Sequence, residues 1–195
     1  TDTTEYEGSP TWSPDSQWLA YEAYVEGNLD IYLRSLTDPS MEPILLTTES
    51  PGIDRAPAWS PLGRQIAFIS DRSGDADIWL ADLDVSNDRF TNLSRNPKVS
   101  EDHPVWSPEG RFLSWASPFN GEHRILAWDR QSTAEYGGTV GIGDWPAWTP
   151  AADVLFTTLS GPNQTSLDAF ERITGLQRMP QFNLPGTVYG LLWKN

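Results

Sequence analysis

The chain has 195 residues, no cysteine, and 13 basic against 27 acidic side chains, which give a formal charge of −14. The lack of cysteine excludes disulfide bonds, thiolate metal sites and a cysteine nucleophile, and the acidic balance disfavours nucleic acid as a partner because like charges repel. No stretch approaches the roughly 20 apolar residues of a membrane helix, and no signal segment stands at the N-terminus, so we expect no membrane insertion.

A tryptophan motif occurs four times along the chain and sets its organisation. It reads Pro-x-Trp-Ser/Thr-Pro, and its tryptophans lie 47, 47 and 42 residues apart, at Trp12, Trp59, Trp106 and Trp148. Self-similarity at this period indicates a repeat architecture. Because a single repeat cannot bury both of its faces, we expect each of these tryptophans to pack between neighbouring repeats.

A tight turn follows each tryptophan. The segments Ser60–Gly63 and Ser107–Gly110 place Ser first, Pro second and Gly fourth, which is the composition of a β-turn. Ser16 and Ala152 stand at the Gly position in the first and fourth repeats. These two turns are therefore predicted to be less favourable than the other two.

Predicted strands fill the rest of each repeat. Short apolar runs rich in aromatic and β-branched residues follow the turns, and a hairpin tip with Gly leads into a second run. The first runs are Trp18–Tyr21, Ile66–Ile69, Phe112–Trp115 and Val154–Phe156, and the second runs are Asp30–Leu33, Asp77–Leu80 and Arg124–Ala127. A weaker outer strand is expected near Pro43–Leu46, Phe90–Leu93 and Gln177–Phe182.

Four short antiparallel strands in each repeat are typical of a β-propeller blade. The predicted fold class is all-β, with four-stranded antiparallel blades at residues 9–53, 54–100, 101–142 and 143–186. Residues 187–195 would begin a further blade or supply a closing strand. We expect a piece of a longer propeller, and a closed four-bladed ring is the alternative. An open arc would expose blade faces to the missing blades, to a partner or to self-association.

The second repeat carries the fullest form of the pattern, from Pro57 to Trp79: Pro-x-Trp-Ser-Pro-x-Gly-x-x-Ile-Ala-Phe-x-Ser-Asp-Arg-x-Gly-x-x-Asp-Ile-Trp. It resembles the WD40-like repeat of the TolB-like propellers, and the resemblance extends from Pro10 to about Phe182. The fourth repeat departs from it, with Thr149 in place of Ser and no Ser-Asp-Arg tip. The resemblance implies an extracytoplasmic location, periplasmic or secreted, and a place in envelope or surface assemblies.

The loops before the repeated motif are the best candidates for a binding site. In a propeller, the loop that precedes each innermost strand lies on one face near the central channel, so the four loops should converge there. Their carboxylates would form a negatively charged mouth, and they are Glu7, Asp54, Glu101, Asp102 and Asp144. Arg55, His103 and Trp145 vary from loop to loop, as specificity would require. The alternative is a solvated acidic rim whose Asp side chains bond backbone amides.

Catalytic motifs are scarce. The two histidines, His103 and His123, occur without a Gly-x-Ser-x-Gly sequence, so a Ser-His-Asp nucleophile within the chain is not expected. Patterns typical of zinc, calcium or phosphate-binding loops do not occur. We therefore predict no catalytic residue, no metal site and no cofactor.

One stretch, Ser70–Asp77, superficially resembles a calcium loop because Asp71, Asp75 and Asp77 could supply oxygen ligands. A hairpin tip explains it better. In that interpretation Asp71 accepts backbone amides and Arg72 pairs with a carboxylate.

These features favour a non-catalytic propeller module that binds a protein or peptide, and basic peptides suit its charge. The alternative is part of the substrate-gating propeller of a prolyl-oligopeptidase-like serine peptidase whose catalytic domain lies outside this chain. A four-bladed lectin or metal-binding ring, with Trp145 or Trp128 stacked on a sugar, is a third hypothesis.

Overall fold

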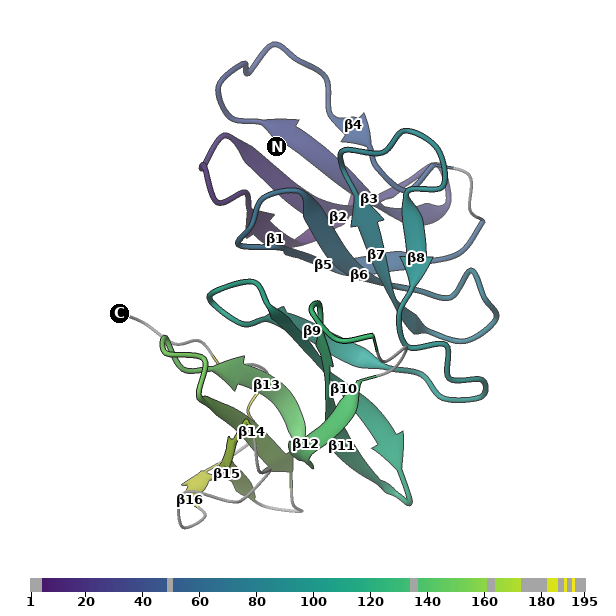
Figure 1. Ribbon diagram of the computed structural model, residues 1–195. Helices are drawn as coiled ribbons and strands as arrows, with labels where there is room; N and C mark the ends of the chain where they lie inside the picture. The colour runs from purple at the N-terminus through teal and green to yellow at the C-terminus, as the bar shows by residue number, and fades with distance from the viewer. Residues whose placement is uncertain are drawn as a thin grey trace. The chain divides into compact units, whose positions relative to one another are not determined.

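The computed structural model describes residues 5–48, 51–133, 137–160, 164–172, 182–185, 188 and 191. These residues form sixteen β-strands in four antiparallel sheets, and each sheet contains four strands that are consecutive in the sequence (Figure 1). The all-β class with four-stranded antiparallel sheets is confirmed. The chain divides into two compact halves, residues 1–98 and residues 99–195, which we describe one at a time.

The N-terminal half contains the first two sheets. The first sheet consists of β1 (Glu7–Trp12), β2 (Trp18–Val25), β3 (Asn28–Ser35) and β4 (Ile44–Leu45). The second sheet consists of β5 (Asp54–Trp59), β6 (Gln65–Ser70), β7 (Asp77–Asp82) and β8 (Phe90–Asn92). In both sheets the strand that carries the repeated tryptophan lies at one edge and the short outer strand lies at the other.

The C-terminal half contains the other two sheets, with the same strand order. The third sheet consists of β9 (Asp102–Trp106), β10 (Phe112–Phe119), β11 (Glu122–Asp129) and β12 (Gly138–Ile142). The fourth sheet consists of β13 (Asp144–Trp148), β14 (Val154–Ser160), β15 (Gln164–Glu171) and β16 (Phe182–Pro185).

The predicted turns are present after each repeated tryptophan. The amide of Gly63 donates to the carbonyl of Ser60 at 2.9 Å, and the amide of Gly110 donates to that of Ser107 at 2.8 Å. Where the glycine is replaced, Ser16 and Ala152 adopt φ values of 58° and 55°. A side chain in this left-handed region is strained, so the prediction that these two turns are less favourable stands and can be tested by substitution.

Two of the repeated tryptophans pack between sheets as predicted. Trp59 of the second sheet belongs to a buried cluster with Ala20, Ile31 and Leu46 of the first repeat. Trp12 behaves differently, because it is 60 % exposed. No sheet precedes it within the described residues of the N-terminal half, so the packing predicted for Trp12 is not seen.

In the C-terminal half, Trp148 packs in the same way as Trp59. It belongs to a buried cluster with Ala116, Ile125 and Val140 of the third sheet. Trp106, also buried, instead meets Trp128 of its own sheet edge-on, with ring centroids 6.4 Å apart.

The outer strands were predicted unevenly. β4 and β8 fall within the predicted segments Pro43–Leu46 and Phe90–Leu93, and β16 begins at Phe182, the last residue of the third predicted segment. Residues 173–181 lie outside the described residues, as does most of the predicted closing segment 187–195.

The strand β12 was not predicted, because its glycines resemble a loop. One of these glycines is required by packing: a Cβ on Gly141 would lie 2.5 Å from the ring of Phe170 in the fourth sheet. The described part of the chain contains no helix that is long and apolar enough to cross a membrane.

Candidate functional site

The innermost strands β1, β5, β9 and β13 share an irregular step directly before the repeated proline. Their pairing register shifts there in all four sheets, and the residue before the proline has a positive φ: Ser9 (48°), Ala56 (50°), His103 (55°) and Trp145 (47°). This conformation costs a non-glycine residue roughly 1–2 kcal/mol, and a bulge re-aims the side chains beside it. The fold therefore repeats one strained step and leaves its side chain free to vary.

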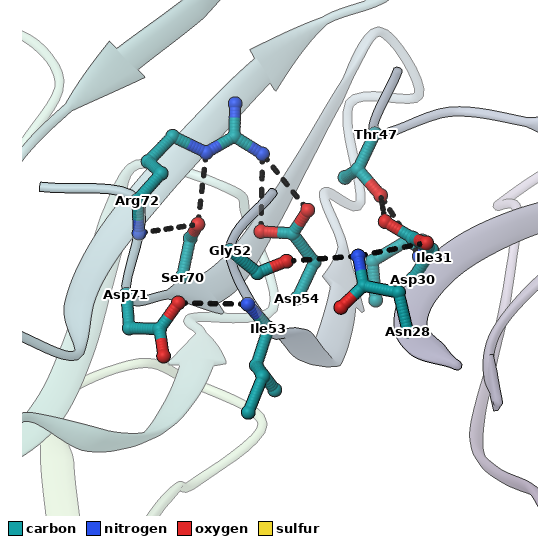
Figure 2. A network of polar contacts seen from close by, with 10 residues as sticks. All are labelled: Asn28, Asp30, Ile31, Thr47, Gly52, Ile53, Asp54, Ser70, Asp71 and Arg72. Atoms are coloured by element: carbon teal, nitrogen blue, oxygen red, sulfur yellow. Dashed lines mark hydrogen bonds and ion pairs between the residues drawn. The ribbon is translucent and has the colours of Figure 1, made fainter. Parts of the chain in front are cut away.

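In the N-terminal half, Asp54 is a buried structural residue. Its side chain is 0 % exposed, and Nη2 of Arg72 donates to both carboxylate oxygens at 3.0 Å. Figure 2 shows Arg72 reaching from Ser70, which accepts its Nε at 2.8 Å, to Asp54. Burial raises the pKa of Asp54, while hydrogen bonds from Ser70 and the charge of Arg72 oppose that rise. Asp54 thus does not present its charge to solvent.

The Ser70–Asp77 stretch forms the bonds expected of a hairpin tip. The carboxylate of Asp71 accepts the amide of Ile53 at 2.7 Å, and Arg72 pairs with Asp54 (Figure 2). Asp77 accepts from Ser94 at 3.1 Å and from Asn92 at 2.7 Å. Among the described residues, no group of three or more His, Asp or Glu side chains could hold a metal ion.

Next to this tip, hydrogen bonds link the first sheet to the loop before β5. Asn28 donates to the carbonyl of Gly52 and to Asp30, each at 3.2 Å. Thr47 donates to Asp30 at 3.1 Å and accepts the amide of Ile31 at 3.0 Å (Figure 2). These contacts anchor the loop before β5, so its conformation is fixed by neighbours that are distant in the sequence.

The remaining predicted residues of the N-terminal half, Glu7 and Arg55, are half-buried at the starts of β1 and β5. Glu22, a carboxylate that the sequence did not single out, anchors the bulge at Ala56 in β5. Glu22 in β2 accepts the amide of Ala56 at 2.6 Å and the hydroxyl of Tyr6 at 2.7 Å. The bond to Glu22 raises the pKa of Tyr6. Glu22 directly follows the predicted run Trp18–Tyr21 and lies within the longer observed strand β2, so its sequence position gave no signal of this role.

In the C-terminal half, the two acidic residues before the third motif have different environments. Glu101 is 0 % exposed and accepts from Ser117 at 3.4 Å, which makes it a structural residue. The side chain of Asp102 is 39 % exposed. It accepts the amide of His103 at 2.8 Å, and its Oδ1 lies 3.9 Å from Nε2 of His103. Asp102 therefore keeps its charge at the surface.

His103 and Trp145 occupy equivalent bulges in the third and fourth sheets, and the structure brings them together. Their rings stack with centroids 3.5 Å apart and planes inclined by 33°. The carboxylate of the neighbouring residue Asp144 contacts Nδ1 of His123 in β11. Both histidines of the chain thus contact the consecutive residues Asp144 and Trp145.

We call Asp102, His103, His123, Asp144 and Trp145 the His–Trp cluster. It holds four of the eight predicted binding residues, together with His123, whose part in it was missed because His123 lies in a hairpin far from the motif. Carboxylates and aromatic rings are the groups that bind cationic side chains. The predicted convergence of all four loops on one channel mouth involves both halves and stays a prediction.

Comparisons with solved structures find propellers. The chain is similar to TolB from Acinetobacter baumannii, with a TM-score of 0.71 and 20% identity over 92% of this chain and 43% of that one. It is also similar to a putative TolB from Agrobacterium tumefaciens, with a TM-score of 0.65 and 20% identity over 94% of this chain and 83% of that one. At these identities the likeness concerns the fold.

A peptidase also shares the fold. A puromycin-hydrolyzing peptidase from Mycobacterium tuberculosis is similar with a TM-score of 0.68 and 14% identity, over 94% of this chain and 29% of that one. The chain thus spans less than half the length of the peptidase and of the Acinetobacter TolB. A comparison with curated proteins gave no match.

The sequence itself identifies the family. Residues 1–187 match the TolB beta propeller domain, which covers nearly the whole chain. The four-stranded antiparallel sheets and the likeness to solved TolB structures agree with that match. The chain therefore belongs to the TolB β-propeller domain family.

Proposed function

We propose that this propeller domain binds a cationic segment of a protein or peptide at the His–Trp cluster, and that it acts without catalysis. The observation that supports the proposal most is the stack of His103 on Trp145, because two strained bulges aim these rings at each other. The same backbone step occurs at Ser9 and Ala56, so what distinguishes the His103–Trp145 pair is that two large rings occupy positions where the N-terminal half has small side chains.

Charge supports a basic partner. Asp102 and Asp144 flank the stack, with side chains 39% and 22% exposed. The chain as a whole carries a formal charge of −14, which would steer a cationic partner toward it. Aromatic rings add cation–π attraction to a Lys or Arg side chain.

The predicted binding residues take different roles in this proposal. Asp102, His103, Asp144 and Trp145 contact the partner. Glu7 and Arg55 belong to the N-terminal half and are not assigned to this contact surface, and the buried carboxylates Asp54 and Glu101 support the loops of their own halves from within. This division follows from burial, since a fully buried carboxylate cannot reach a partner.

Selection from a displayed random-peptide library tests the proposal. Peptides enriched on the immobilised chain should be rich in Lys and Arg, and Trp145→Ala should weaken their binding about tenfold or more, as for the anchor of an interface. Trp12→Ala is the matched control, because Trp12 is exposed and lies in the other half. Enrichment without basic residues, or equal binding to Trp145→Ala, would refute the proposal.

A second function is supported by the likeness to peptidases. The puromycin-hydrolyzing peptidase and the structurally similar prolyl endopeptidases contain a part that shares this fold, and this chain would then be part of a substrate-gating propeller. The coding sequence that flanks this chain separates the two proposals: a neighbouring Gly-x-Ser-x-Gly segment with downstream Asp and His would favour the gate.

We also propose an extracytoplasmic location, periplasmic or secreted, on the strength of the family resemblance. Fractionation of the source cells with an antibody against the chain checks this, and recovery in the cytoplasmic fraction alone would contradict it.

A further inference from the structure

A groove of about 640 Å³ lies between the first two sheets, on the side of the Trp-Ser-Pro turns. Its size falls within the range of small-molecule sites. Trp59 contributes to its lining together with six further apolar side chains: Trp18, Leu33, Ile44, Leu46, Leu62 and Leu83. Ile44 and Leu62 are exposed, so apolar surface continues to the rim.

The walls of the groove are held in place by internal hydrogen bonds. The indole of Trp59 donates to the carbonyl of Gly63 at 3.0 Å, and the amide of Leu83 donates to the carbonyl of Arg64 at 2.9 Å. The groove is therefore formed before any ligand arrives, which lowers the entropic cost of binding.

Most polar groups of the lining already have partners within the chain. The hydroxyl of Ser13 donates to Asp15 at 2.5 Å and accepts the amide of Trp18 at 2.9 Å. Arg64 forms an ion pair with Asp84 at 2.9 Å. A bound peptide would bury backbone N–H and C=O groups against these satisfied walls, which is costly. An aliphatic chain has no backbone polar groups to bury, so it avoids this cost.

One cation remains available. Arg89 lines both this groove and a neighbouring hollow of about 340 Å³. Within the described residues, no ion-pair partner of the Arg89 guanidinium is found, although acidic residues outnumber basic ones two to one in the chain. A guanidinium binds a planar carboxylate through two parallel hydrogen bonds.

We infer that the groove binds a monocarboxylate with a long aliphatic tail, that is, a fatty acid. The tail lies on the apolar walls along Leu33, Leu46 and Leu83, and the carboxylate pairs with Arg89. This site lies in the N-terminal half and does not depend on the His–Trp cluster.

Calorimetric titration of the 195-residue chain with dodecanoate, below its micelle concentration, tests the inference. One-to-one binding is expected, and Arg89→Gln should weaken it about tenfold or more because a charge-assisted bond is lost. Leu62→Trp should weaken it by filling the rim, without loss of stability. Arg95→Gln is the matched control, since Arg95 is exposed in the same half and its guanidinium donates to the nearby carbonyl of Asn92 at 3.0 Å.

Two further measurements locate the site and separate it from general stickiness. Methyl NMR shifts should move at Leu33, Leu46 and Ile44, and dodecyltrimethylammonium should not compete. Trp145→Ala should bind dodecanoate as wild type does. The fatty-acid inference and the peptide proposal can therefore fail independently of each other. No binding, equal binding by Arg89→Gln, or equal binding of the cationic amphiphile would overturn the inference.

Discussion

The imidazole of His103 and the indole of Trp145 stack with their centroids 3.5 Å apart, and each ring belongs to a residue with a positive φ directly before a proline. Pre-proline residues normally favour the extended region. Both side chains are therefore positioned against local preference by the pairing of the strands around them. The contact joins β9 of the third sheet to β13 of the fourth, so it depends on the fold of the C-terminal half.

Loss of the buried charge at Asp54 should destabilise the N-terminal half strongly. Asp54→Asn leaves the guanidinium of Arg72, only 11% exposed, without its carboxylate, and breaking such a pair costs about 3–5 kcal/mol. Arg64→Gln is the control, because the Arg64–Asp84 pair is exposed and such pairs contribute under about 1 kcal/mol. Urea unfolding followed by tryptophan fluorescence gives both values, and similar losses would contradict the burial argument.

Exchange of residues between two equivalent turns should change stability in opposite directions. Ser16→Gly relieves a side chain at φ 58°, which should gain about 0.5 kcal/mol after the entropic cost of glycine. Gly63→Ser places a side chain at φ 91° and should lose about 1 kcal/mol. Thermal unfolding of both variants checks this, and a shift of both melting temperatures in the same direction would count against it.

Close packing at Gly141 predicts that an added methyl group is not tolerated there. A Cβ would lie 2.5 Å from the ring of Phe170, and overpacking of this kind costs about 1–3 kcal/mol. Gly138→Ala in the same strand is the control, since no atom lies within 4 Å of its added Cβ. A Gly141→Ala protein as stable as the Gly138→Ala protein would show that β12 does not pack as described.

Acid should remove the contribution of the Arg111–Asp129 pair. Arg111 donates to both carboxylate oxygens at 2.9 and 2.7 Å, and its hydrogen bonds lower the pKa of Asp129. A lowered pKa stabilises the folded state above the unfolded value of about 3.9, and this stabilisation is lost as the pH falls through the folded value. Wild type should exceed Asp129→Asn in stability at pH 7, and the difference should shrink as the pH falls below about 3.9. A constant difference across this range would be the contrary result.

The sheets could be predicted because each repeat carries its own local signals. Turn residues such as Gly63 and apolar runs such as Ile66–Ile69 act over short distances, so the sequence alone located them. The strand β12 was missed because Gly141 is selected by contact with Phe170, which is distant in the sequence. Similarly, Trp12 shares its motif with Trp59 but not its burial, because burial depends on a neighbouring sheet.

The candidate site was predicted in part. The loops before the motifs did supply Asp102, His103, Asp144 and Trp145, which cluster in the structure. The sequence could not predict whether a loop carboxylate faces solvent. Asp54, for example, is buried and paired with Arg72, which lies in the connection between β6 and β7. His123 was missed for a related reason. It contacts Asp144 only because the third and fourth sheets pack against each other.

Recognition of a cationic segment by the His–Trp cluster can be checked by isothermal titration calorimetry, with one selected basic peptide titrated into wild type and variants. We predict that His103→Ala and Trp145→Ala each weaken binding about tenfold or more. The double variant should lose little affinity beyond the weaker-binding single variant, because the two rings act together. Trp12→Ala should bind like wild type. Full affinity in the Trp145→Ala variant, with the fold intact, would contradict the claim.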